Sequence, residues 1–345
     1  MRTNDAQMLV LCALTDGPLH GYAINAAIEQ VSGHRLGPGS LYGALARLEA
    51  KQLVKPLEGK GRQRPVCLTP AGRELLEQEA LSMARLSGRV FESAVPDEIS
   101  YLDRLAATDT ARSYKSVMLH ALDARPGQTV LDLGCGPGTD LNTLAKAVSP
   151  SGRVIGIDSS QKMVEQAQRR TEGLSAVEVQ LGDIHTLPLE DGGIDRARTE
   201  RVLQHAADPA RVLAEARRVL RPGGRLVMGE PDWDSLTIDY PDIEVSRAYT
   251  RHVTDKVVRN GVIGRQLARL APDAGFAVLA VVPVTSVFRD VQAADQVLGL
   301  QRNTERAVSA GYLSALASQR WLDHLATGPF FAAVTLHVVV AEATS

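Results

Sequence analysis

The chain has 345 residues, enough for two domains, and its 44% hydrophobic and 23% charged residues are typical of a globular protein in solution. A formal net charge of −2 excludes a surface that binds nucleic acid throughout, and no apolar run approaches the ~18 residues of a membrane-spanning helix. Without a basic and then apolar leader at the N-terminus, the chain is expected to be cytoplasmic and not to contact membranes.

The cysteines are few and widely spaced, at Cys12, Cys67 and Cys135. An odd number at such separations favours reduced thiols over a disulfide framework or a cysteine metal site. We therefore expect free thiols and no bound metal.

Three short amphipathic segments predict a helix-turn-helix core near the N-terminus. The first lies around residues 8–14 and ends at the turn residues 16–18, and the second spans about residues 22–31. Ser40 is expected to cap a third helix. The apolar stripe of that helix has i, i+4, i+7 spacing and consists of Leu41, Leu45 and Leu48.

A basic hairpin and a long helix are predicted next. Residues 53–54 and 66–68 are expected to form two short strands around the basic loop 58–64, where the local excess of positive charge suggests phosphate contact. A helix capped at Thr69 is expected to reach about residue 92 and to pair with a second copy of itself. Its apolar residues near heptad spacing are Leu76, Ala80, Met83 and Val90.

This N-terminal part resembles the PadR-like family of winged-helix transcriptional regulators over about residues 6–92, through the stretches GPLHGYAINAAIE, GPGSLYGALARLEAKQLV and GRQRPVCLTPAGRELL. The resemblance implies that the third helix and the hairpin bind operator DNA and that the last helix forms a dimer. Carried over by position, the residues that would face phosphates or bases are Tyr42, Arg47, Arg62 and Arg64.

A change of composition marks the end of this part. Residues 93–109, SAVPDEISYLDRLAATD, mix proline, serine and acidic residues and are typical of a linker. We therefore expect a winged-helix domain at residues 1–95, a linker at 96–110 and a second domain at 111–345.

The second domain begins with a strand, a glycine turn and a helix. The stretch TVLDLGCGPG, residues 129–138, predicts a buried strand and then a loop in which Gly134 and Gly136 let a ligand approach the backbone. A dinucleotide-binding loop would have a third glycine where Thr139 stands, so a nicotinamide cofactor is disfavoured.

Further strands are expected to end at the same crevice. Strands at residues 153–157, 177–181 and 194–199 are followed by acidic residues that include Asp158 and Asp183. The last two strands are predicted at 276–288 and 330–340, with one of them antiparallel. Helical insertions at residues 236–261 and 291–328 are expected to act as lids.

The stretches VLDLGCGPGT, GIDSSQKMVEQA, LGDIHTLPLEDGGID, ERVLQHAADP and EARRVLRPGGRLVMGEPDW resemble class I S-adenosylmethionine (SAM)-dependent methyltransferases over about residues 105–345. Within that class they are most similar to the group that includes the quinone-biosynthesis C-methyltransferases. The resemblance implies an α/β fold with a Rossmann-like seven-stranded sheet and SAM as cofactor.

The same resemblance implies the residues that hold the cofactor. Asp132, with the backbone of Gly134 and Gly136, would bind the methionine ammonium group, and Glu200 would lie beside the methionine moiety. At the nucleoside end, Asp158 would bind the ribose diol, and Ser159 is a further cofactor-binding candidate. The residues that would contact the adenine are Met163, Asp183 and Ile184.

Candidate acceptor-site residues follow the fourth and fifth strands. His205 is the first candidate for a general base, and the alternative is a structural histidine beside the helix that begins at residues 208–209. After the fifth strand, Glu230 is a second catalytic candidate, and Trp233 is expected to offer an aromatic platform to the substrate.

The preferred hypothesis is a SAM-dependent methyltransferase of a small organic metabolite, in which the winged helix forms a homodimer and covers the active site. The third helix favours this role over DNA reading, because Ala44 and Ala46 cannot donate hydrogen bonds to bases. One alternative is a PadR-like regulator that binds DNA and uses SAM or a product as effector. Another is a SAM-binding enzyme that catalyses a reaction other than methylation.

Overall fold

The computed structural model describes residues 6–15, 17–32, 35–57, 64–76 and 97–345. The chain divides into two compact units, one of residues 1–89 and 314–323 and the other of residues 90–313 and 324–345. No helix in these described ranges is long and apolar enough to cross a membrane.

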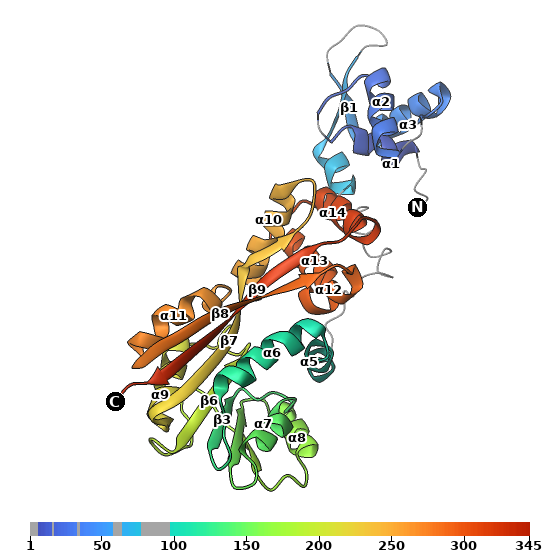
Figure 1. Cartoon of the computed structure of the whole chain (residues 1–345). Helices are drawn as coiled ribbons and strands as arrows, with labels where there is room; N and C mark the ends of the chain where they lie inside the picture. The colour runs from blue at the N-terminus through green and yellow to red at the C-terminus, as the bar shows by residue number, and fades with distance from the viewer. Residues whose placement is uncertain (1–5, 16, 33–34, 58–63, 77–96) are drawn as a thin grey trace. The chain divides into compact units, whose positions relative to one another are not determined.

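The N-terminal unit has the helices and the hairpin expected of a winged helix (Figure 1). The helices are α1 (Ala6–Ala13), α2 (Gly21–Ser32) and α3 (Pro38–Ala50), and the antiparallel hairpin is β1 (Val54–Pro56) with β2 (Val66–Leu68). The three helices bury one apolar core that includes Val10, Ile24 and Leu48. Apolar residues at helical spacing therefore pack as the sequence predicted.

The start of α3 differs from the prediction. Its N-cap is Gly37, which makes no side-chain cap hydrogen bond, and Pro38 stands in the first turn. Ser40 therefore lies inside the helix and does not cap it. Proline starts helices well because its ring fixes φ at a helical value and the amide it lacks would have no partner there.

The long helix that was expected after the hairpin is described only in its first turns. Residues 70–76 are helical, and the Thr69 hydroxyl accepts a hydrogen bond from the Gly72 amide at 3.1 Å, as the predicted cap requires. Leu76 is buried in the core of the winged helix. The predicted heptad positions Ala80, Met83 and Val90 lie outside the described residues.

The second unit contains the predicted seven-stranded sheet, in the order β5-β4-β3-β6-β7-β9-β8. Its strands are β3 (Thr129–Leu133), β4 (Arg153–Asp158), β5 (Val177–Leu181), β6 (Ile194–Glu200), β7 (Leu220–Ile238), β8 (Phe276–Phe288) and β9 (Ala332–Ala343). Strand β9 is antiparallel to both of its neighbours, and the other pairs are parallel. The prediction of one antiparallel strand is confirmed.

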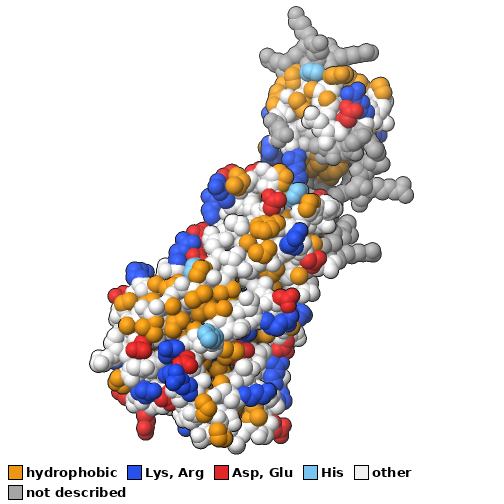
Figure 2. Space-filling view, in the orientation of Figure 1, with side chains coloured by type: hydrophobic (Ala, Val, Ile, Leu, Met, Phe, Trp, Pro, Cys, Tyr) orange, Lys and Arg blue, Asp and Glu red, His pale blue; other side chains and the backbone are white. Residues whose placement is uncertain are grey.

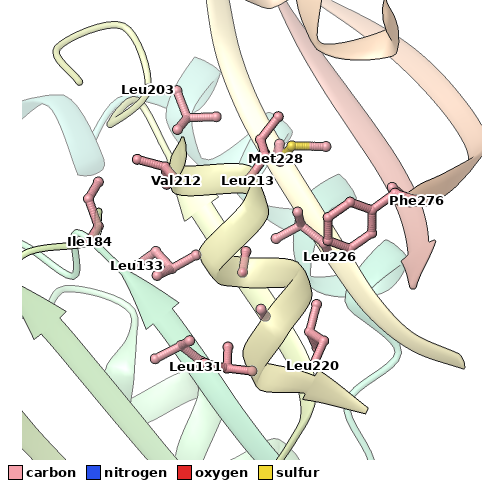
Figure 3. Packing of buried hydrophobic residues seen from close by; sticks show 14 of the residues in the cluster. Leu131, Leu133, Ile184, Leu203, Val212, Leu213, Leu220, Leu226, Met228 and Phe276 are labelled. Atoms are coloured by element: carbon pink, nitrogen blue, oxygen red, sulfur yellow. The ribbon is translucent and has the colours of Figure 1, made fainter. Parts of the chain in front are cut away.

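Helices cover both faces of this sheet. On one face, α9 (Pro209–Val219) and α11 (Ile263–Asp273) pack against alternate residues of the strands, such as Leu131 and Leu226. Figure 3 shows Val212 and Leu213 of α9 in this cluster. On the other face, α6 (Asp109–Leu122), α7 (Leu141–Val148) and α8 (Gln161–Arg170) pack against the intervening residues. This alternation is the period-two pattern of a sheet buried on both sides.

The edge strand β8 is less covered than the rest of the sheet. Leu279, Val281 and Val287 are exposed, and Figure 2 shows hydrophobic side chains gathered over this part of the molecule. Pro283 lies within the strand, and a proline on an edge strand reduces its pairing with further strands.

The insertions are helical, as predicted. Between β7 and β8 lie α10 (Ile243–His252) and the π-helix η2 (Val253–Val257). Between β8 and β9 lie α12 (Val291–Leu298), α13 (Leu300–Ser309) and α14 (Ala315–Thr327), although residues 314–323 belong to the N-terminal unit.

The segment 96–110 is not a linker in the structure. It forms α5 (Glu98–Ala106) and the start of α6. The N-cap of α5 is Asp97, and the N-cap of α6 is Thr108. Leu105 is buried, and the Tyr101 hydroxyl donates to the Val297 carbonyl of α12 at 3.3 Å. The acidic and hydroxyl residues that suggested a linker are helix caps, and the segment is part of the second unit.

Candidate active site

A cavity of about 650 Å³ lies at the carboxyl ends of the parallel strands. Strand ends of β3, β4, β5 and β6 line one half of it, and α5, η2, α12 and α13 line the other half. Ligands of open α/β sheets bind at this edge, and this volume is typical of small-molecule sites.

The glycine loop after β3 forms the floor of this cavity. Gly134 and Gly136 have φ of +70° and +54°, values that L side chains rarely adopt. A Cβ atom on Gly134 would lie 2.4 Å from Cγ2 of Val202, whereas one on Gly136 would meet only Leu102 at 3.7 Å. The loop therefore packs tightly on one side and leaves its backbone open to the cavity on the other.

Asp158 holds the loop in place. Its Oδ2 accepts a hydrogen bond from the Gly136 amide at 2.9 Å, and its Oδ1 accepts one from the Ser160 amide at 2.9 Å. Asp158 and Ser159 line the cavity at the end of β4. Since each carboxylate oxygen has a second lone pair, Asp158 can also accept hydrogen bonds from a ligand.

The end of the cavity near β5 combines apolar and acidic residues. Met163 and Ile184 are 7% and 8% exposed and line it together with Asp183. The Asp183 carboxylate accepts a hydrogen bond from the His185 amide at 2.9 Å and lies 2.6 Å from the His185 ring, and these bonds lower the pKa of Asp183. An ionised acceptor therefore stands beside a flat apolar surface, which suits a purine ring.

A buried charge cluster lies under the opposite end. Lys115 of α6 binds Asp140 at 2.5 Å and Glu200 at 2.6 Å, and Arg198 of β6 binds the same two carboxylates at 2.9 and 2.5 Å. The Tyr114 hydroxyl donates to Glu200 at 2.9 Å.

The cluster has one carboxylate more than it has cations, because Asp132 also belongs to it, 3.3 Å from Arg198. Burial raises the pKa of Asp132 to about 6, against the attraction of Arg198. Nε of Arg198 is the atom that faces Asp132, whereas its buried Nη1 has no hydrogen-bond partner among the described residues. The sequence analysis missed Lys115 and Arg198, although basic residues within the buried strand IDRARTE were a signal of this cluster.

Glu230 contradicts its predicted role. It lies within β7, not after it, it is 0% exposed, and it does not line the cavity. Its Oε1 accepts hydrogen bonds from the amides of Val202 and Leu203 at 2.8 Å each, and its Oε2 accepts one from Gln204 at 3.3 Å. Burial raises the pKa of Glu230 to about 7 despite these donors. The carboxyl group shapes the turn after β6 from behind.

That turn presents Arg201 to the cavity beside Trp233. Arg201 has φ of +56°, and its guanidinium carbon lies 5.9 Å from the centre of the Trp233 ring. Trp233 is 6% exposed and lines the cavity from β7, and its Nε1 donates to Gln204 Oε1 at 2.8 Å. Trp233 therefore lines the cavity with a cation above its ring, and its contact with a substrate stays a prediction.

His205 follows the same turn and lies at the rim of the cavity. Its ring forms no hydrogen bond or ion pair with the part of the chain that is described. Partial burial, and then the charge of Arg201, lower the pKa of His205. The histidine that contacts the start of α9 is instead His185, whose Nε2 accepts from the Asp208 amide at 3.2 Å.

The residues considered for DNA contact are partly described. Tyr42 is 49% exposed, Arg47 is exposed, and Arg64 is exposed with its Nε bonded to the Leu57 carbonyl at 3.0 Å. Arg62 lies outside the described residues. Ala44 is 0% exposed, so it belongs to the core of the winged helix and not to its outer face.

Comparison with known proteins agrees with both units. A family model for a methyltransferase domain matches residues 124–272, and a model for the PadR-like family of transcriptional regulators matches residues 10–78. The second unit is therefore a class I SAM-dependent methyltransferase domain, joined to an N-terminal PadR-like domain.

The chain belongs to the family of the 37.1 kDa protein in transposon Tn4556 of Streptomyces fradiae, with which it shares 89% identity over 344 residues, 100% of both chains. It is 31% identical over 150 residues to the demethylmenaquinone methyltransferase of Staphylococcus aureus, which is 44% of this chain and 62% of that relative. The crystal structure of a proposed methyltransferase of Bacillus halodurans superimposes with a TM-score of 0.51 at 17% identity, over 69% of this chain and 99% of that one.

The cavity fits SAM in charge and shape. The excess carboxylate of the buried cluster matches the positive charge that the ammonium and sulfonium groups carry beyond the cofactor's carboxylate. Nη1 of Arg198, which has no partner among the described residues, can donate to that carboxylate, and the open side of Gly136 leaves room for the backbone to approach the ligand.

Proposed function

We propose that the protein transfers the methyl group of SAM to a small organic metabolite bound in the half of the cavity that the helical insertions line. The observation that carries this proposal is the glycine loop tied to Asp158, with a buried excess of negative charge on one side and an apolar chamber on the other. This arrangement provides a cofactor half and an acceptor half in one cavity.

Bound SAM supplies a methyl group on a positively charged sulfur, and a nucleophile displaces this sulfur in line from the methyl carbon. The chain's contribution is alignment, which can provide about 7–11 kcal/mol in well-oriented reactions. In the proposed site, Asp158 and Ser159 bind the ribose, Asp183 and Ile184 bind the adenine edge, and Met163 packs on its face. Asp132, Glu200 and the backbone of Gly134 and Gly136 hold the methionine end.

The acceptor half is suited to exclude water. Its apolar lining comes from α5, η2 with the residue after it, and α12, and consists of Leu105, Val253, Val257, Val258, Val297 and Leu298. Trp233 closes the side next to β7. A nucleophile in such a chamber is freed from competing water at the moment of attack.

His205 is the proposed general base. The lowered pKa keeps its ring neutral at pH 7, and its nitrogens are available because no described residue occupies them. It would accept a proton from an acceptor hydroxyl, amine or acidic carbon as the methyl group is transferred.

The acceptor is not carried over from a relative. The Staphylococcus aureus protein is a demethylmenaquinone methyltransferase, but the aligned part covers 62% of its length and 44% of this chain. Demethylmenaquinone is therefore one compound in an acceptor panel, and methyl transfer is scored by mass spectrometry as formation of S-adenosylhomocysteine (SAH). Turnover of the substrate without formation of SAH would instead support a SAM-binding enzyme of another reaction type.

We further propose that the PadR-like domain forms a homodimer and covers the active site of a cytoplasmic enzyme. The near-heptad apolar pattern in the sequence after Thr69 supports the first part, and three free cysteines support a reducing compartment. The alternative is a DNA-binding regulator. An electrophoretic shift with promoter DNA that is lost on Arg62→Ala plus Arg64→Ala would favour it.

The site itself is tested by Asp158→Ala. Because the variant removes charge-assisted bonds and the anchor of the Gly136 amide, we expect SAH binding to weaken by about 1.5–3 kcal/mol in calorimetry. The matched control is Asp191→Ala, an acid with a 79% exposed side chain outside the cavity. Equal SAH affinity in wild type and Asp158→Ala would contradict the proposed site.

A further inference from the structure

We propose that Arg201 forms an anion-binding end of the acceptor half, so that the acceptor is an apolar molecule with one anionic group such as a carboxylate or phosphate. This inference rests on the proposed function, since it assigns the substrate class of the same cavity. It is carried by three observations on the described residues: the fixed orientation of Arg201, the absence of a paired carboxylate, and the apolar surroundings.

Arg201 is held in place by its backbone. Its amide donates to the Gly229 carbonyl at 2.8 Å, and its carbonyl accepts from Gln204 Nε2 at 3.0 Å. The next three amides are bound by the buried Glu230. A φ of +56° in a non-glycine residue costs free energy, and such strain persists where the surrounding structure imposes it, often at functional sites. Here it directs a long cationic side chain into the cavity.

The guanidinium group of Arg201 has no ion pair with any described residue. Glu200 and Glu230 are close enough to influence its charge, but Glu200 is bound by Lys115 and Arg198, and Glu230 by backbone amides. Its one described partner is the face of the Trp233 ring. Nearby acidic groups favour the charge of Arg201, but no described carboxylate is bonded to its guanidinium group, so its N–H donors can bind an anionic ligand.

The other charges of the cavity leave this end positive. Most of its carboxylates are already engaged at the cofactor half: Asp132, Asp140 and Glu200 with Lys115 and Arg198, Asp158 with amides, and Asp183 with His185. The remaining one, Glu98, lies on the exposed side of α5. At the acceptor half, Arg201 faces a lining of valines and leucines. An apolar body with one anionic group matches this distribution.

Arg201 has a second anion that it could bind, the carboxylate of SAM itself. Nη1 of Arg198, which has no partner among the described residues and belongs to the buried cluster, favours Arg198 for that role and leaves Arg201 for the acceptor. The two sources are distinguished by measuring SAH affinity and acceptor affinity separately.

The experiment uses the full chain saturated with SAH and titrated by calorimetry with two aromatic anions, 1-naphthoate and phenyl phosphate, and with the neutral 1-naphthamide. We expect at least one anion to bind the wild type at least tenfold more tightly than the amide. Arg201→Gln should abolish this preference while SAH affinity stays unchanged, and Arg201→Lys should restore part of it. The matched control is Arg259→Gln, an exposed arginine outside the cavity, which should keep the preference.

Three outcomes overturn the inference: no binding of either anion to the SAH-loaded wild type at millimolar concentration, equal affinity for anion and amide, or a tenfold loss of SAH affinity in Arg201→Gln. The last would assign Arg201 to the cofactor. Failure of the wild type to bind SAH is a different result, because it contradicts the proposed function itself.

Discussion

His205 shows how local surroundings prepare a side chain for a proposed role. A histidine on the rim of the cavity would titrate near pH 6.5 if it were fully solvated, but partial burial and the charge of Arg201 disfavour the imidazolium form. A lowered pKa leaves the neutral ring, which is the form that accepts a proton, as the main species at pH 7. Arg201 therefore has two effects in the proposed site, one on the acceptor and one on the base.

The pH dependence of methyl transfer tests this role. If His205 is the base, kcat/KM falls as pH decreases through its pKa, so the midpoint of the acid limb lies below 6.5 and the rate is full at pH 7 to 8. His205→Ala should lower turnover ~100-fold and remove this limb. His120→Ala, an exposed histidine on α6 outside the cavity, should leave rate and profile unchanged. An unaltered rate in His205→Ala would return His205 to a structural role.

Glu230 has a structural role, unlike the catalytic role proposed for His205. The residue types in GEPDW suggested a polar group facing the substrate, yet β7 continues through this stretch and alternates its side chains between the two faces of the sheet. Glu230 points behind the turn after β6 and binds three of its amides, whereas Trp233 lines the cavity. Strand continuation, not residue type, decided which of the two reaches the ligand.

At the scale of elements, the strand, glycine turn and helix unit is the part that defines the cofactor half. Gly134 is the residue on which its geometry depends most, because a side chain there would be strained by the backbone angle and would overlap Val202. Gly173 has φ of +82° but open space around it, and it lies outside the cavity. A substitution at either glycine strains the backbone, but only a substitution at Gly134 also changes the shape of the loop that lines the cavity.

We expect Gly134→Ala to reduce SAH affinity at least tenfold, since its methyl group must displace Val202 or the loop. Gly173→Ala should lower stability by about 1–2 kcal/mol, the cost of a left-handed alanine, and leave SAH affinity as in the wild type. The readouts are calorimetry with SAH and a thermal melt of each variant. Equal SAH affinity in all three proteins would show that the loop does not contact the cofactor.

The chain as a whole joins a PadR-like domain to a methyltransferase domain, as the family matches show. The heptad pattern beyond Leu76 predicts that the N-terminal unit pairs with a second copy.

Sedimentation of the full chain tests this pairing. We expect a dimer, and we expect Met83→Asp plus Val90→Asp to shift it to a monomer, because two carboxylates would be buried in an apolar helix contact. Gln78→Asp plus Ala84→Asp adds the same acidic groups away from the apolar stripe and should keep the dimer. A wild-type chain that sediments as a monomer at micromolar concentration would contradict the predicted homodimer.

Short-range patterns in the sequence were sufficient for the seven strands, the winged-helix elements and the glycine loop, because periodicity, turn residues and motif spacing act over a few residues. The buried cluster of Lys115, Arg198 and their carboxylates, the position of Glu230 behind its turn, and the place of α5 in the cavity wall depend on residues far apart in the chain. Only tertiary packing brings such groups together, since the free energy of a buried charge depends on its neighbours in space and not on its neighbours in sequence.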